Sequence, residues 1–196
     1  MPTHTRAAVT APPPSPQLVA LLVHWSQHRW TLPVLGYMQR KGGARHAELL
    51  RSLGIGRESA RLTLDWLVDQ GWILRNTGYG HALRPEYVLS SRAIPHGKAI
   101  CDLLEVLEGQ GIEEVALRKW ALAVLLVLGK SGDRFGNLKS QLPGITPRAL
   151  TQVLKALQES GVITREIGEG YPPTVHYAPS SVGRLVQSRL GLGDLS

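Results

Sequence analysis

The sequence predicts a mainly α-helical chain with small β-hairpins, arranged as two similar blocks joined by a helical connector. Apolar residues recur at helical spacing in several segments. Short runs of β-branched residues follow two of these segments and are separated by glycine and proline. Many residues of 118–190 match residues of 30–92 at an offset near 90 positions. So many matches at one offset indicate an internal duplication.

Composition limits the possible functions. The 196 residues suffice for one large domain or two small ones. No apolar run approaches the roughly 18 residues of a membrane span. A proline cluster stands where a secretory signal would have its apolar core, so we expect a cytoplasmic protein, located at the nucleoid, with no membrane partner. The single cysteine excludes an internal disulfide framework and a cysteine-based zinc site.

The charge is positive and unevenly distributed. The net charge is +7 and the isoelectric point is about 9.9, which favours a polyanionic partner. Residues 30–92 carry nine basic and five acidic side chains, and residues 118–190 carry ten and four. Between them, residues 93–117 carry one basic and five acidic side chains. No single segment concentrates lysine and arginine as a membrane-binding helix would.

The chain begins with a segment for which we expect no fixed structure. Residues 1–15 are rich in proline and polar residues and read as a disordered arm. Residues 16–29 predict a helix with an apolar stripe that includes Leu18 and Trp25. His24 and His28 are four residues apart, a spacing that can hold a metal. Since no third ligand stands nearby, we expect two partly exposed polar residues and no metal site.

The first block, residues 30–92, predicts three helices and a hairpin. The helices span about 32–41, 44–53 and 57–69. The hairpin runs from Trp72 to Tyr87, with its tip at Gly78–His81. Together with the leading helix, this block forms a predicted domain over 16–92.

The acidic connector, residues 93–117, predicts one helix at about 96–108. Its apolar stripe consists of Ile100, Leu103, Leu104 and Leu107 and needs a partner, either in the same chain or in a second copy. Cys101 lies beside the stripe, and we expect a buried, inert thiol. A redox-sensing cysteine requires positive charge nearby, whereas the charged neighbours of Cys101 are acidic.

The second block, residues 118–190, contains the most informative helix. A turn at Pro143–Gly144 precedes Thr146, which can cap a helix, and Pro147 suits the first helical position. Leu150 and Leu154 belong to the core face of this helix. Strands at 162–167 and 174–177 follow, and then a final helix at 181–190, with Leu185, Val186 and Leu190 expected to pack back. Residues 191–196 form a tail.

The opposite face of the helix that begins at Pro147 is basic and rich in hydrogen-bonding groups. It carries Arg148, Thr151, Gln152 and Lys155. The second helix of a helix-turn-helix needs such a face, because its N-terminal part meets base edges and phosphates. Arg148 and Gln152 suit guanine and adenine in the major groove. Further phosphate contacts are expected from Lys155, Arg134, Lys139 and Arg165.

Helix, strand, loop and strand is the order of a winged helix, and the motifs of this block resemble one family. They are Lys119–Trp120, Arg134–Leu138, Leu142–Ile145, Leu150–Thr151, Gly161 and Pro172–Pro173. Over about residues 118–190 the chain resembles the HxlR-type branch of the MarR-like winged-helix transcription regulators. One departure is that the family usually has a cysteine shortly before the Lys–Trp pair, whereas Cys101 lies nineteen positions before Trp120.

The duplication predicts a second, more diverged winged helix in the first block, with a different charge pattern. At the offset, Arg148 and Lys155 correspond to Glu58 and Asp65. A carboxylate facing phosphate opposes binding. Arg57 and Arg61 offset this in part. The first block could therefore read bases with Glu58, touch DNA mainly through its hairpin, or bind protein. The hairpin residues available for DNA are Arg75, His81 and Arg84.

We therefore expect a double-stranded DNA-binding protein, a transcription regulator with tandem winged helix-turn-helix domains. The alternatives are a DNA-binding replication initiator or nucleoid-associated factor, and a protein-interaction module. Clustered acids, a nucleophile motif and a phosphate loop are missing from the sequence, so we expect no enzyme, no cofactor and no catalytic residue. Relatives of the HxlR type form homodimers through helices outside the wing. Two winged helices would let one chain span two half-sites, and the apolar stripe of the connector, whose length suits packing between its own two domains, favours a monomer. The alternative is a homodimer joined through 96–108.

Overall fold

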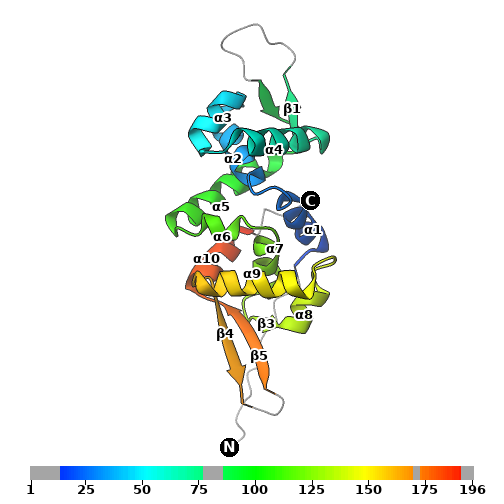
Figure 1. Ribbon diagram of the computed structural model, residues 1–196, viewed down its shortest axis with the longest axis vertical. Helices are drawn as coiled ribbons and strands as arrows, with labels where there is room; N and C mark the ends of the chain where they lie inside the picture. The colour runs from blue at the N-terminus through cyan, green and yellow to red at the C-terminus, as the bar shows by residue number, and fades with distance from the viewer. Residues whose placement is uncertain (1–13, 77–85, 170–172, 191–196) are drawn as a thin grey trace, which may run out of the picture.

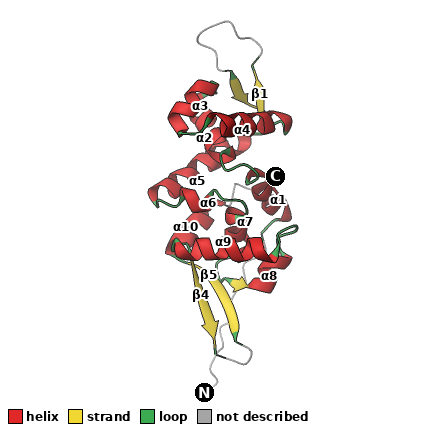
Figure 2. Ribbon diagram, in the orientation of Figure 1, coloured by secondary structure: helices red, strands yellow, loops and turns green. Residues whose placement is uncertain are grey.

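The computed structural model describes residues 14–76, 86–169 and 173–190 of the chain. Figure 1 shows an elongated molecule with one β-hairpin at each end and helices between them. Figure 2 gives the same arrangement by secondary structure, with the strands confined to the two ends. Among the described helices, none has both the length and the hydrophobicity needed to cross a membrane.

Within its described residues, the first half contains four helices and a short hairpin. The elements are α1 (Pro16–Trp25), α2 (Thr31–Lys41), α3 (His46–Leu53), α4 (Arg57–Asp69), β1 (Ile73–Arg75) and β2 (Tyr87–Leu89). β1 and β2 are antiparallel, with Ile73 opposite Leu89 and Arg75 opposite Tyr87. The three predicted helices of 30–92 are confirmed, and the hairpin lies where it was expected. Its tip at 78–81 lies outside the described residues.

The second half has the same order of elements, with one additional strand and a final helix. It consists of α7 (Ala121–Leu128), β3 (Asp133–Arg134), α8 (Phe135–Ser140), α9 (Pro147–Glu159), β4 (Ile163–Gly168), β5 (Thr174–Pro179) and α10 (Ser181–Leu190). Its three strands are antiparallel in the order β3-β5-β4. The helix-turn-helix α8–α9 and the hairpin β4–β5 are the two parts of a winged helix.

The connector lies between the two halves and packs on both. It comprises the 3-10 turn η1 (Ile94–His96), α5 (Gly97–Gly109) and α6 (Glu113–Ala116). α5 packs against α2 on one side and α10 on the other. Ile100, Leu103 and Leu107 of its stripe are each at most 1% exposed. The stripe therefore has its partner within the chain.

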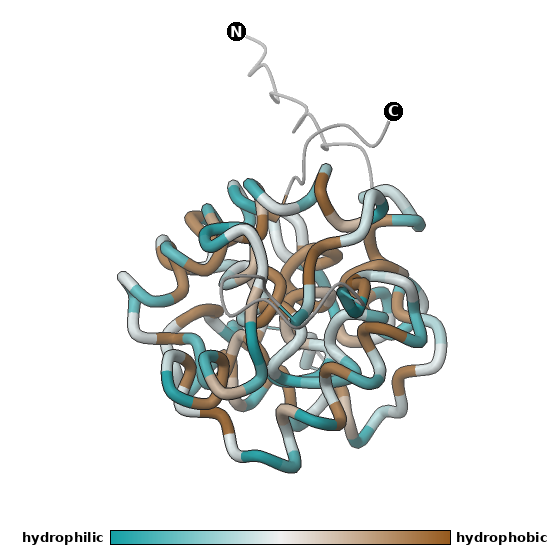
Figure 3. Tube along the Cα trace, turned by 90° about the horizontal axis from the view of Figure 1, so that it is seen from above, coloured by the Kyte–Doolittle hydropathy of each residue, from teal (hydrophilic) through white to brown (hydrophobic). Residues whose placement is uncertain are grey.

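Buried residues from both halves and from α5 form one continuous hydrophobic core. In Figure 3, hydrophobic and hydrophilic stretches alternate along the trace, as amphipathic helices require. α7 is the exception, because all its residues except Leu126 are buried. Cys101 is buried as predicted, with its Sγ 3.6 Å from the carbonyl oxygen of Gly36.

Three features differ from the sequence predictions. α1 ends at Trp25 and not near residue 29, because the following turn docks on the second half: Ser26 Oγ accepts from the backbone N–H of Trp120 at 3.3 Å. The short elements β3 and α6 were not predicted. Leu185 was expected to pack back but is 38% exposed, whereas Val186 and Leu190 are fully buried.

Candidate nucleic-acid interface

α9 is held in place by its cap and its apolar face. Thr146 Oγ1 accepts a hydrogen bond of 3.1 Å from the backbone N–H of Ala149, and Pro147 occupies the first turn. This is the N-cap predicted from the sequence. Leu150, Leu154 and Leu157 are each at most 1% exposed. The opposite face of α9 is therefore directed to solvent.

Arg148, Thr151, Gln152 and Lys155 are all exposed on that outer face. Arg148 has no ion pair or hydrogen bond within the described part of the chain. Lys155 lies 3.7 Å from Glu159 in an exposed pair one turn apart. Such exposed pairs contribute little to stability, so the ammonium group remains available to a stronger anionic partner.

Thr151 and Gln152 have different surroundings. The Thr151 hydroxyl donates to the carbonyl oxygen of Pro147 at 2.9 Å, so its proton is engaged while its methyl group and lone pairs are free. Gln152 lines a groove of about 680 Å³ beside α9. Arg118 and Lys119 line the same groove. These two cations share the groove with Gln152 and were not among the predicted contacts, although Lys119 belongs to the Lys–Trp motif.

The remaining predicted contacts of the second half lie on the elements around α9. Arg134 is on β3, Lys139 on α8 and Arg165 on β4. Arg134 and Arg165 are exposed, and Lys139 is half-buried. In Figure 1 all these elements lie at the same end of the molecule as α9. The structure thus brings the predicted residues of 118–190 to one end, on four different elements.

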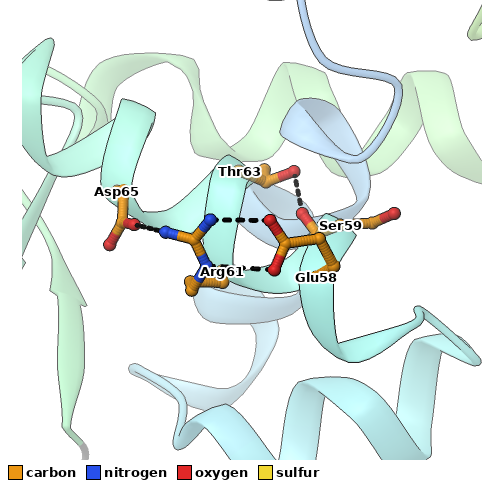
Figure 4. A network of polar contacts seen from close by, with 5 residues as sticks. All are labelled: Glu58, Ser59, Arg61, Thr63 and Asp65. Atoms are coloured by element: carbon orange, nitrogen blue, oxygen red, sulfur yellow. Dashed lines mark hydrogen bonds and ion pairs between the residues drawn. The ribbon is translucent and has the colours of Figure 1, made fainter.

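On α4, the third helix of residues 30–92, charged side chains of the exposed face form ion pairs with one another. Arg61 lies between two carboxylates, at 2.6 Å from Glu58 and 3.1 Å from Asp65 (Figure 4). Its hydrogen bond to Glu58 raises the pKa of the Arg61 guanidinium and lowers the pKa of the Glu58 carboxyl. The two carboxylates outnumber the one guanidinium, so this face of α4 presents no excess of positive charge.

The hairpin of the first half offers a second paired cation. Arg75 lies 3.5 Å from Glu86, on the chain just before β2. Arg57 is exposed at the first position of α4. Arg84 and His81, which were also predicted to reach DNA, lie outside the described residues. Of the predicted cations of this half, Arg61 and Arg75 therefore already have acidic partners.

The two histidines of the N-terminal segment are used in packing. His24 Nε2 accepts a hydrogen bond of 3.2 Å from Trp72 Nε1, and the His24 ring lies 4.7 Å from that of Trp66. Burial and the nearby Arg92 lower the pKa of His24. His28 contacts Trp66 at 5.3 Å. In the described ranges, no three histidine, cysteine or carboxylate side chains are grouped as a metal site requires.

Comparison with known proteins identifies the second half. A family model described as HxlR-like helix-turn-helix matches residues 115–192, close to the predicted range of 118–190. An uncharacterized HTH-type transcriptional regulator of Synechocystis is 35% identical over 78 residues, which cover 40% of this chain and 58% of its own. The uncharacterized HTH-type transcriptional regulator YtcD of Bacillus subtilis is 37% identical over 79 residues, covering 40% and 63%.

A third relative is covered more fully. The putative regulatory protein MalR of Fusobacterium mortiferum is 37% identical over 75 residues, which cover 38% of this chain and 71% of its own. The first two relatives are covered over little more than half their length. No solved structure matches the chain.

Proposed function

Because the chain belongs, through residues 115–192, to the HxlR-like helix-turn-helix family of DNA-binding transcription regulators, we propose that it binds double-stranded DNA with two winged helices in one chain. The observation that carries this proposal is the outer face of α9. There Arg148 is unpaired within the described residues, and it stands beside Gln152 and Lys155 at the N-terminal part of a well-capped helix. Arginine and glutamine can discriminate guanine and adenine, and the lysine supplies phosphate affinity.

The first half is the second winged helix in this proposal. Its order of helix, helix, helix, strand and strand is that of α7, α8, α9, β4 and β5. The similarity at an offset near 90 residues supports a common origin by duplication. The domain division that follows is 16–92, 93–117 and 118–190. Since Arg61 of α4 lies between Glu58 and Asp65, whose two negative charges exceed its own, α9 supplies most of the affinity and the first half supplies less.

One feature favours a second role for the first half, as a surface that binds protein. α4 exposes Leu62 and Val68 at 45% and 37%, beside the Glu58–Arg61–Asp65 network. Apolar side chains among paired charges suit a protein partner better than a phosphate backbone. This role is compatible with DNA binding by α9.

Selection of bound fragments from random duplex DNA tests the main proposal. We expect a recovered motif with two unlike half-sites, because α4 and α9 present different side chains. Binding to that motif should weaken steeply as salt rises, with a log–log slope of several units. A Lys98→Ala/Arg189→Ala variant, which loses two positive charges away from α9, should bind as tightly as the native chain, since these exposed cations lie on α5 and α10. No enrichment of any motif, or an affinity that does not respond to salt, would refute the proposal.

A further inference from the structure

A cavity of about 580 Å³ lies between α1 and the second half of the chain. Val19, Ala20 and Val23 line it from α1, and Val127, Gln141 and Pro143 line it from the other side. Its volume falls within the range of about 300–1,000 Å³ that is typical of small-molecule sites. One wall is α1, which lies outside residues 115–192, so the cavity is not formed by the family domain alone.

The lining defines the chemistry of an occupant. Most of the lining side chains are proline, valine or alanine, and the polar ones are His24, Gln27 and Gln141. Among the described lining residues there is no lysine, arginine, aspartate or glutamate. An ion would therefore lose its hydration without a compensating charge, whereas an uncharged apolar molecule would not.

Two polar groups of this lining remain available. His24 Nε2 already accepts from Trp72, and burial lowers the pKa of His24, so the neutral ring carries its proton on Nδ1. That N–H has no hydrogen-bond partner within the described part of the chain. Gln141 donates its amide N–H to Asp133 at 3.3 Å, which leaves its carbonyl oxygen as an acceptor. Gln27, in contrast, uses both of its polar atoms: its amide nitrogen donates to the carbonyl oxygen of Val23, and its amide oxygen accepts from Lys119.

We propose that this cavity binds an uncharged, largely apolar small molecule that carries a hydroxyl or carbonyl group, and that this molecule is an effector of DNA binding. An oxygen atom of the occupant would accept from His24, and a hydroxyl could also donate to Gln141. Residues 141–143 form part of the turn between α8 and α9, so the occupant touches the segment that sets the position of α9. The effector role rests on the proposed function, whereas binding to the cavity does not.

2-Naphthol is a suitable probe, because it is neutral at pH 7, apolar and has one hydroxyl. We expect saturable binding by calorimetry with a dissociation constant on the order of 0.1–1 mM, given its small size. Ala20→Trp should fill the cavity and abolish binding. Gln17→Trp is the matched control, since Gln17 is exposed on α1 but does not line the cavity. Gln141→Leu should weaken binding about three- to tenfold through the loss of one hydrogen bond.

The outcomes separate the site from its role. No binding of 2-naphthol, or binding that Ala20→Trp and Gln141→Leu leave intact, overturns the site. If the probe binds, saturating 2-naphthol should change the DNA dissociation constant of the native chain by about threefold or more and leave that of Ala20→Trp unchanged. An unchanged DNA affinity overturns the effector role alone. Failure of the proposed function would appear as an absence of DNA binding while the probe still binds.

Discussion

Nη2 of Arg61 lies 2.6 Å from Oε1 of Glu58 on the same face of α4. Asp65 contacts the other terminal nitrogen of the same guanidinium at 3.1 Å. A phosphate that approaches Arg61 must therefore compete with two carboxylates that are already in place, and it meets their negative charge. The second position of α9, which Glu58 occupies in α4, carries Arg148, which has no such competitor among the described residues.

Replacement of the cations of α9 should therefore weaken DNA binding more than replacement of the cations of α4. We expect Arg148→Ala/Lys155→Ala to reduce affinity on the order of tenfold or more, and Arg57→Ala/Arg61→Ala to reduce it by about threefold or less. Both variants remove two positive charges, so each serves as the control for the other. Fluorescence anisotropy with one labelled duplex at fixed salt measures both, and equal losses would contradict the charge argument.

Arg148 should also determine sequence preference at one position. A bidentate contact to guanine predicts that Arg148→Ala loses about 1–3 kcal/mol on the preferred site and tolerates other bases at one position. Lys139→Ala should weaken all sites alike, because a phosphate contact carries no sequence information. Binding to a panel of single-base variants distinguishes these patterns. A uniform loss for Arg148→Ala would mean that Arg148 binds phosphate.

The elements that the sequence predicted well are those determined locally. α9 follows from its Pro–Gly turn, its cap at Thr146 and its regular leucines, and the structure reproduces all of them. The pairing of Arg61 with Glu58 and Asp65 was not predicted, although spacings of three and four residues on one helix allow it. The stripe of α5 was recognised, but its partners α2 and α10 were not, since periodicity does not identify the opposing surface.

The features that the sequence did not reveal depend on contacts between distant segments. β3 has only two residues, and its strand character comes from pairing with β5, where Asp133 lies opposite Tyr177. α1 ends early because residues 26 and 27 bond to Trp120 and Lys119, more than ninety positions away. The cavity beside α1 exists only once these segments have packed, so no local pattern could have predicted it.

Close packing at Gly183 should make an alanine substitution destabilising. A Cβ at Gly183 would clash with the carbonyl oxygen of Val162, a backbone atom just before β4 that already accepts hydrogen bonds from Ser180. We expect Gly183→Ala to lower the free energy of unfolding by about 1–3 kcal/mol, although alanine favours helices. Gly136→Ala in α8 is the control: a Cβ there meets nothing within 4 Å, so it should stabilise by up to about 1 kcal/mol. Urea unfolding measures both, and a stable Gly183→Ala variant would contradict the packing.

Stability should fall as the pH drops below about 6.5, because two histidines are partly buried. Burial, followed by the charge of Arg92, lowers the pKa of both His24 and His96. As the pH falls, the histidines of the unfolded chain therefore bind protons before those of the folded chain do. The stabilisation from the neutral rings is complete above the unfolded pKa and is lost as the pH falls through the folded pKa values. Urea unfolding between pH 7 and 5 should show a flatter profile for His24→Gln/His96→Gln than for the native chain. Parallel profiles would mean that other groups control this range.

We expect a monomer in solution, because α5 already has its partners. Leu103 and Leu107 are at most 1% exposed between α2 and α10, so a dimer formed through this helix would first have to separate the two halves. Light scattering at micromolar concentration should give a mass near 21.4 kDa.

Leu103→Ala and Leu107→Ala should each lower the free energy of unfolding by about 2–5 kcal/mol without changing that mass. Glu105→Ala, on the exposed side of the same helix, should change neither. A doubled mass that is lost when Leu103 and Leu107 become charged would place the stripe of α5 at a dimer interface.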